Sequence, residues 1–202
     1  MGSYYYLLSQ LPSLSYGQKP PMSPEAFKDL ARSLLDASDA ALLDMVSLDP
    51  RPSPADGGRS YADTAPSSGS DFIDNWREWE RVLRLNLAKQ RALKTKREGA
   101  VTVEPPVVPA DASAAALRAI TAMESPLEAE VLIDKARWSA IDALQGIEPF
   151  DRKVVFAYLL KLFILQRHDS FQAETGFSEY KSIYASILES AQTGTSRAGE
   201  SK

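Results

Sequence analysis

The side chain best suited to acid–base chemistry near neutral pH is histidine, and the chain contains a single one, His168. It stands between Arg167 and Asp169 at the charged end of an apolar stretch. Paired with a nearby carboxylate, His168 would make the protein a hydrolase. The pattern around it favours a simpler interpretation, a cation at a helix C-terminus that the helix dipole stabilises.

Metal and nucleotide sites need groups that this sequence supplies poorly. The absence of cysteine excludes thiolate zinc sites, iron–sulfur clusters and cysteine nucleophiles. Gly57-Gly58 lacks the strand and helix that flank a phosphate loop. Carboxylates recur at helical spacing at Glu124, Glu128, Glu130 and Asp134. Without calcium-loop spacing, we interpret them as a solvated helix face paired in part with Lys135 and Arg137. The sequence therefore predicts no catalytic, cofactor-binding or metal-binding residue.

The strongest binding signal is a basic ridge on a long predicted helix. Arg77, Arg84 and Arg91 stand seven residues apart beside a tryptophan stripe, so they share one helix face. Such a ridge suits an acidic partner helix, a phosphate backbone or lipid head groups, whereas the alternative is a solvated face whose arginines neutralise local acids. The predicted partner contacts are Phe72, Trp76, Arg77, Arg81, Arg84 and Arg91. Trp138 and Lys161 are expected instead to be core residues or to have the apolar part of the side chain buried.

Composition limits the remaining classes. A formal net charge of −4 on a mixed surface does not indicate nucleic-acid binding. The N-terminus lacks the basic and apolar regions of a secretory signal, and the most apolar stretch, 154–165, is about half of the roughly 20 residues that cross a bilayer. With no cysteine, these features favour a cytoplasmic protein without a membrane span.

The elements that must position these residues are helices. Ser23-Pro24 is a strong helix start and Gly146 a helix end, while the helix that begins near Asp151 has little polar face and is expected to be central. Tyr4–Leu8 is either a short strand or the first turn of a buried segment. The predicted fold is an all-α bundle of one domain or two small lobes. Its expected parts are an N-terminal helical segment (1–48), a flexible Pro/Gly/Ser linker (49–70), a long basic helix (71–98), a Pro-rich break (99–112), a C-terminal helical region (113–191) and a disordered tail (192–202).

Three blocks of sequence carry a family resemblance. They are YYYLLSQLP at Tyr4–Pro12; FIDNW at Phe72–Trp76 with LRLNLA at Leu83–Ala88 and Arg91–Ala92; and RWSAID at Arg137–Asp142 with FAYLLKL at Phe156–Leu162, Gln166–Arg167 and Gly176. On these blocks the chain resembles a poorly characterised bacterial family encoded among V/A-type ATPase subunits.

The resemblance implies a function without chemistry. By its place among rotary ATPase genes, such a protein is similar to the C (or d) subunit, the helical socket that couples the central rotor shaft to the membrane ring. The implied role is a non-catalytic accessory or coupling subunit. Its implied partners are central-stalk and membrane-ring subunits, and it would be peripheral to the inner membrane through that complex. The alternative is a free helical adaptor that binds an acidic protein or anionic surface through the basic ridge.

Overall fold

The protein is described here by a computed structural model, which covers residues 4–49, 66–94 and 125–170, except for the side chains of 90–94 and 126. Over these ranges the regular structure is helical and contains no strand, so the predicted all-α fold is confirmed. The chain forms two compact units, Met1–Gln166 and Arg167–Lys202, and the first holds nearly all described residues. Most of the predicted linker, the Pro-rich break, residues 113–124 and 171–191 of the predicted C-terminal helical region, and the tail lie outside the described residues.

The N-terminal block is a helix, α1 (Tyr5–Gln10), and not a strand. Its start is fixed to a segment far along the chain, because the backbone N–H of Tyr4 donates to the carbonyl oxygen of Phe150 at 2.9 Å. Leu7 is buried and anchors the helix to the core. Of the two alternatives that the apolar run left open, the structure has the helical one.

Two short helices follow. α2 (Pro24–Arg32) starts where the sequence predicts, since the side chain of Ser23 accepts a hydrogen bond from the N–H of Ala26 at 3.1 Å and proline occupies the first turn. α3 (Ala37–Leu43) ends before Leu48, the last residue of the predicted N-terminal helical segment. The residues after α3 instead form an irregular segment that lies against α4.

Three long helices complete the described structure: α4 (Asp71–Lys94), α6 (Pro126–Gln145) and α7 (Arg152–Ser170). Ser125 caps α6 by accepting from the N–H of Glu128 at 3.4 Å. Gly146 ends it with φ 74° and ψ −163°, a backbone conformation that residues other than glycine rarely adopt. The C-terminal end of α6 is therefore where the sequence predicts it.

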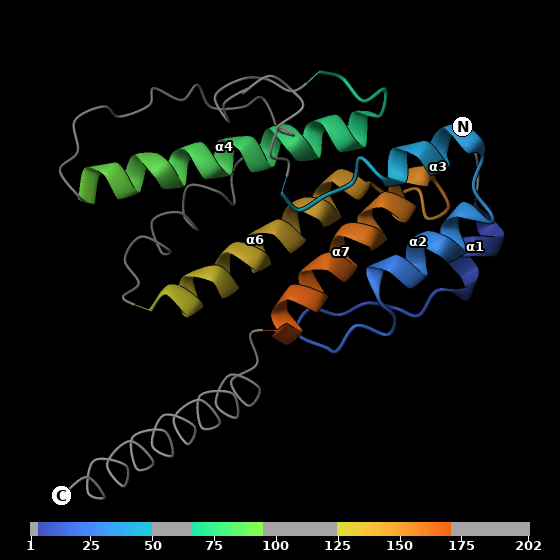
Figure 1. Cartoon of the computed structure of the whole chain (residues 1–202), viewed down its shortest axis with the longest axis horizontal. Helices are drawn as coiled ribbons and strands as arrows, with labels where there is room; N and C mark the ends of the chain where they lie inside the picture. Colours follow the sequence, from blue (N-terminus) through green and yellow to red (C-terminus); the bar gives the residue numbers. More distant parts are fainter. Residues whose placement is uncertain (1–3, 50–65, 95–124, 171–202) are drawn as a thin grey trace, which may run out of the picture. The chain divides into compact units, whose positions relative to one another are not determined.

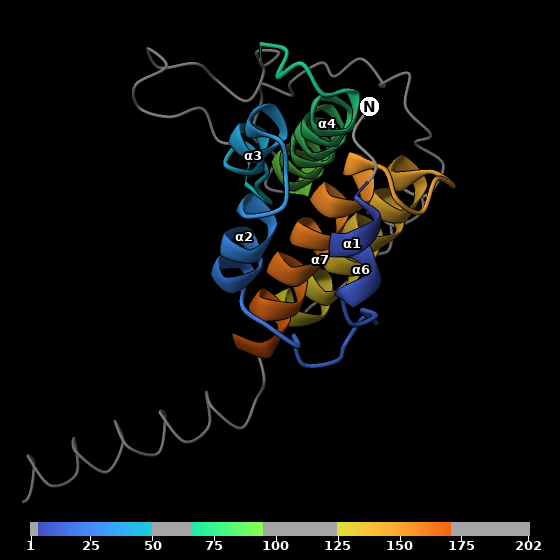
Figure 2. The ribbon, with the colours of Figure 1, turned by 90° about the vertical axis from the view of Figure 1, so that its right-hand side faces the viewer.

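Helix α7 is the centre of the first unit, as its apolar sequence predicts. It lies between α2 and α6 in both views (Figures 1 and 2). The rings of Phe156 and Phe72 bring it against α4 at 6.3 Å between centroids, and those of Tyr158 and Phe27 bring it against α2 at 4.9 Å. Its buried residues are Val155, Phe156, Ala157, Tyr158, Leu159, Leu160, Leu162, Ile164 and Leu165. None of the helices described here is both long enough and apolar enough to cross a membrane.

Candidate functional site

The two aromatic residues predicted to contact a partner are core residues of this fold. Phe72 and Trp76 expose only 2% and 1% of their surface. The Trp76 ring stacks on Trp79 with 5.6 Å between centroids, and its indole N–H donates to the carbonyl of Ser47 at 2.9 Å. In this conformation neither side chain is available to another protein.

Two arginines of the basic ridge bind the chain's own backbone. Arg77 donates to the carbonyl oxygen of Met45 at 3.2 Å, and Arg84 donates to that of Leu48 at 3.3 Å. Together with Trp76, they give three donors of α4 to the irregular segment after α3. The segment after α3 is not helical, so its carbonyl groups need other hydrogen-bond donors, and these side chains of α4 provide them.

Arg81 pairs with an acid of its own helix. Its guanidinium donates to Glu78 at 2.8 Å from Nε and 2.5 Å from Nη2. These hydrogen bonds lower the pKa of Glu78 and raise that of Arg81. The structure describes the backbone of Arg91 within α4, but its side chain lies outside the described part.

A buried charge cluster joins α4 to α6. Glu80 is fully buried and accepts from Arg137 at 2.6 Å and 3.0 Å, and from Arg84 at 2.8 Å. Arg137 also donates to Asp134 at 2.9 Å. Burial disfavours the charged guanidinium of Arg137, but hydrogen bonds and charges from Glu80 and Asp134 outweigh it and raise its pKa. Arg84 extends the cluster to Asp49 at 3.2 Å.

This cluster corrects one prediction. The carboxylates around 124–134 were expected to form a solvated helix face, yet Asp134 is buried. It is buried because α6 packs against α4, and the guanidinium of Arg137 satisfies its charge. Over the described residues, every buried side-chain nitrogen or oxygen has a hydrogen-bond partner, and there is no group of three or more candidate metal ligands.

A second buried polar group fixes the N-terminus. The hydroxyl of Tyr4 donates to Asp39 of α3 at 2.6 Å, and Arg152 at the start of α7 donates to the other carboxylate oxygen at 3.1 Å. Burial, and next the hydrogen bond to Asp39, raise the pKa of Tyr4. Because the three residues are far apart in sequence, no local pattern could have indicated that they meet.

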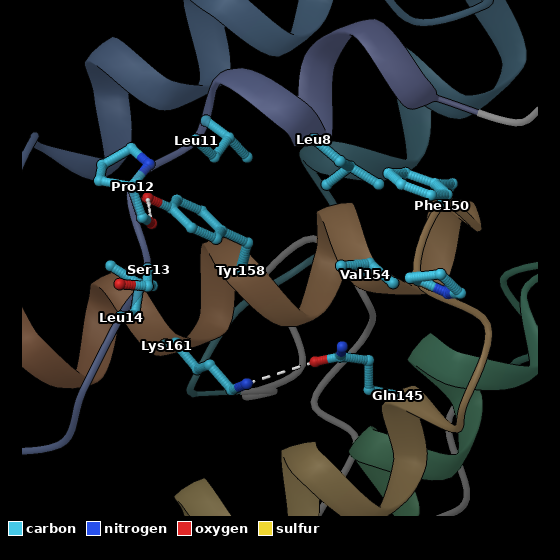
Figure 3. A pocket seen from close by; sticks show the side chains of 11 residues that line it. Leu8, Leu11, Pro12, Ser13, Leu14, Gln145, Phe150, Val154, Tyr158 and Lys161 are labelled. Atoms are coloured by element: carbon cyan, nitrogen blue, oxygen red, sulfur yellow. Dashed lines mark hydrogen bonds between the residues drawn. The ribbon is translucent and has the colours of Figure 1, made fainter.

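A pocket of about 220 Å³ lies between α1, the chain that follows it and α7 (Figure 3). Its apolar lining comes from Leu8, Leu11, Pro12, Leu14, Pro149, Phe150, Val154 and Tyr158, and its polar lining from Ser13, Gln145 and Lys161. Lys161 is ion-paired with Asp142 at 2.7 Å and bonded to Gln145 at 3.2 Å. This volume is below the roughly 300–1,000 Å³ typical of sites for whole small molecules.

Lys161 and Trp138 behave as expected from the sequence. The lysine stem is largely covered, and its ammonium lies 5.4 Å from the centre of the Trp138 ring. Its charge is therefore balanced at the edge of the pocket by Asp142 and the indole face. This leaves the pocket itself close to neutral.

Beside the pocket is an exposed aromatic and aliphatic surface that the sequence interpretation missed. We define the α1 surface as Tyr5, Tyr6, Ile147 and Phe150. Tyr6 is 71% exposed and Ile147 is 94% exposed, while the ring of Tyr5 packs on Phe150 at 4.3 Å. α1 lies at the same end of the bundle as the α6–α7 turn (Figures 1 and 2). A sequence signal existed, because residues 1–18 contain no charged side chain.

His168 lies in the last turn of α7, together with Arg167. This is the position of a cation that stabilises a helix C-terminus. Both residues belong to the second compact unit, Arg167–Lys202.

No family model matches the chain, and no curated protein or solved structure matches it significantly. A functional assignment therefore depends on the sequence blocks and on the geometry described above.

Proposed function

We propose that this protein is a non-catalytic accessory or coupling subunit of a V/A-type rotary ATPase, which links stalk and membrane-ring subunits through helix-mediated contacts. Such a subunit needs a rigid helical body and a surface that other subunits recognise. It needs no reacting group.

One observation carries the proposal: the three sequence blocks that resemble the ATPase-associated family pack on one another. The hydroxyl of Tyr158 in the third block donates to the carbonyl of Pro12 in the first at 3.0 Å. Phe72 of the second block contacts Phe156 of the third. Several residues of the three blocks, among them Leu7, Phe72 and Phe156, therefore belong to the core of the first unit.

The α1 surface supports a binding role better than the basic ridge does. Tyr6 and Ile147 are exposed apolar groups, which cost solvation free energy unless a partner covers them. The ridge residues Arg77 and Arg84 would first have to leave their contacts with the segment after α3. For this reason the free adaptor that binds through the ridge has less support.

Co-purification tests the proposal. The tagged full chain is recovered from its native cells in mild detergent at moderate salt, and the retained proteins are identified by mass spectrometry. We expect stalk and ring subunits of the ATPase. Cells without the ATPase genes are the control. Recovery of none of these subunits, from cells shown to contain the assembled ATPase, would contradict the proposal.

A salt titration separates the alternative. An adaptor held by arginine ridge contacts loses its partner as ionic strength rises, because screening weakens exposed charge pairs. Contacts through apolar groups are retained under the same conditions.

A further inference from the structure

We propose that residues 45–49, here called the strap, form an autoinhibitory contact, because they occupy a surface of α4 that binds a non-helical segment of a partner protein. The partner segment replaces the strap, with an apolar side chain at the position of Val46 and a carboxylate at that of Asp49. This inference adds regulation to the proposed role in protein contacts. It rests on contacts within this chain and not on the identity of the partner.

Helix α4 holds the strap mainly by its backbone. Three carbonyl groups of the strap accept hydrogen bonds from side chains of α4, namely those of Met45, Ser47 and Leu48. The donors are, respectively, Arg77, Trp76 and Arg84. α3, which leads into the strap, lies beside α4 in both ribbon views (Figures 1 and 2). Since every peptide unit has a carbonyl group, the same donors can bind a segment of different sequence.

Two side chains of the strap make the contact selective. Val46 is buried and belongs to the core cluster, and the carboxylate of Asp49 pairs with Arg84 at 3.2 Å. A basic residue in place of Asp49 would face the guanidinium of Arg84, so the surface favours an acidic segment. The partner segment therefore carries an apolar residue followed, three positions later, by an aspartate or glutamate.

The strap is attached weakly enough to be exchanged. Of its side chains only that of Val46 is buried, whereas Met45 is exposed and the other three are partly exposed. Release restores the backbone entropy of the strap, which opposes the loss of this one buried side chain and of the hydrogen bonds to α4. Segments with few buried apolar groups open without unfolding of the whole protein. A partner segment then supplies new acceptors to the donors of α4, so none stays unpaired.

Thiol labelling measures this opening. The chain contains no cysteine, so Val46→Cys supplies a single buried thiol, and Val155→Cys in α7 supplies the matched reference in the core. Cysteine is a small apolar residue and replaces valine with little disturbance. In the native full chain, iodoacetamide should label position 46 at least about 100-fold faster than position 155, because only position 155 requires unfolding of the core.

A second substitution relates the opening to α4. Arg77→Ala removes one donor to the strap and should raise the labelling rate at position 46 about threefold to tenfold, with no change at position 155. Arg81→Ala is the matched control, since this arginine of the same helix binds Glu78. It should leave both rates within about twofold.

Peptide binding tests whether the uncovered surface accepts another segment. The probe is a fluorescent peptide with blocked ends and the sequence of residues 44–49, and fluorescence anisotropy measures its affinity for the full chain. In the Val46→Ser protein the strap loses its buried side chain, so the peptide should bind at least about tenfold more tightly than to wild type. A peptide that itself carries Val46→Ser should bind about tenfold more weakly. Circular dichroism melts check that each variant folds.

The outcomes are distinct. Equal labelling rates at positions 46 and 155 overturn the proposal, because the strap is then part of the cooperative core. Fast labelling at position 46 without tighter peptide binding to the Val46→Ser protein also overturns it, because the uncovered surface then binds no such segment. Either result leaves the proposed function standing, which the recovery of ATPase subunits decides separately. Fast labelling together with tighter peptide binding supports the autoinhibitory contact, whichever proteins co-purify.

Discussion

Glu80 accepts hydrogen bonds from both Arg84 and Arg137, so one fully buried carboxylate joins an arginine of its own helix to an arginine of α6, 57 residues after Glu80 in the sequence. Asp134 supplies the second negative charge to Arg137. The cluster orients α4 relative to α6, because displacement of either helix would leave a buried charge without its partner.

Removal of the central carboxylate should be strongly destabilising. In Glu80→Ala, the buried Arg137 loses two of its hydrogen bonds, and breaking a buried pair from one side typically costs about 3–5 kcal/mol. Urea denaturation of the full chain measures the change. Glu78→Ala is the matched control on the same helix, since its pair with Arg81 is partly exposed and such pairs contribute about 1 kcal/mol or less. Equal losses in the two variants would contradict the buried-cluster interpretation.

The hydroxyl of Tyr4 should stabilise the fold, and its contribution can be measured alone because phenylalanine keeps the ring and lacks only the hydroxyl. Tyr4→Phe removes the 2.6 Å hydrogen bond to Asp39, and hydrogen bonds to charged groups contribute about 1.5–3 kcal/mol. Chemical denaturation at neutral pH measures the loss. Tyr6→Phe, at an exposed position two residues away, should change stability by less than about 0.5 kcal/mol. If both changes are negligible, the hydroxyl of Tyr4 has no stabilising role.

The free energy of unfolding should fall in alkaline solution. Burial raises the pKa of Tyr158 to about 12 and also raises the pKa of Tyr4. A tyrosine in the unfolded chain has a pKa of about 10. Because the unfolded chain loses these protons first, the stabilisation is complete below about pH 10 and declines above it. The slope approaches about 1.4 kcal/mol per pH unit for each tyrosine.

The matched variants separate the two contributions. Denaturation of wild type, Tyr4→Phe and Tyr158→Phe is compared between about pH 8 and 11, and each variant should decline less steeply than the wild type. Identical slopes in all three proteins would rule out the ionisation of these tyrosines as the cause.

Gly146 should resist substitution although the space around it is open. No heavy atom would lie within 4 Å of an added Cβ, yet φ 74° with ψ −163° belongs to a backbone region used almost only by glycine. We expect Gly146→Ala to cost about 1–3 kcal/mol in thermal or urea denaturation. Gly146→Asn should not restore stability, because ψ lies outside the left-handed helical region that asparagine tolerates. Ser139→Ala, at an exposed position in α6, is the control and should be nearly neutral.

The helices were predictable where local signals determine them. Ser23-Pro24 and Gly146 mark helix ends through capping and backbone conformation, which depend on neighbouring residues alone. Tyr4–Leu8 was ambiguous, since a five-residue apolar run fits a buried strand or a short helix equally well. In the structure this segment is helical, and Tyr4 at its start makes long-range hydrogen bonds that cannot be predicted from the local sequence.

The binding residues were harder to predict for a physical reason. Periodicity shows that Phe72 and Trp76 share an apolar face, but it cannot tell whether that face packs on the same chain or on a partner. The arginines of α4 raise the same problem. Arginines that bind the chain's own backbone carbonyls and arginines that bind a partner can have the same spacing in the sequence. The two tyrosines of the α1 surface carried a different signal, the absence of charged side chains over residues 1–18, which helical periodicity does not report.

The hydrogen bond from Tyr158 to the carbonyl of Pro12 has a consequence for the order of folding during synthesis. At ribosomal speeds of about 5–20 residues per second, the 146 residues between its two partners take roughly 7–30 s to translate. During this interval the uncharged N-terminal segment has no α7 to pack against. Apolar residues of this segment that α7 covers in the folded protein, such as Leu11, therefore stay uncovered until α7 has been made, and early binding of a chaperone there would protect them.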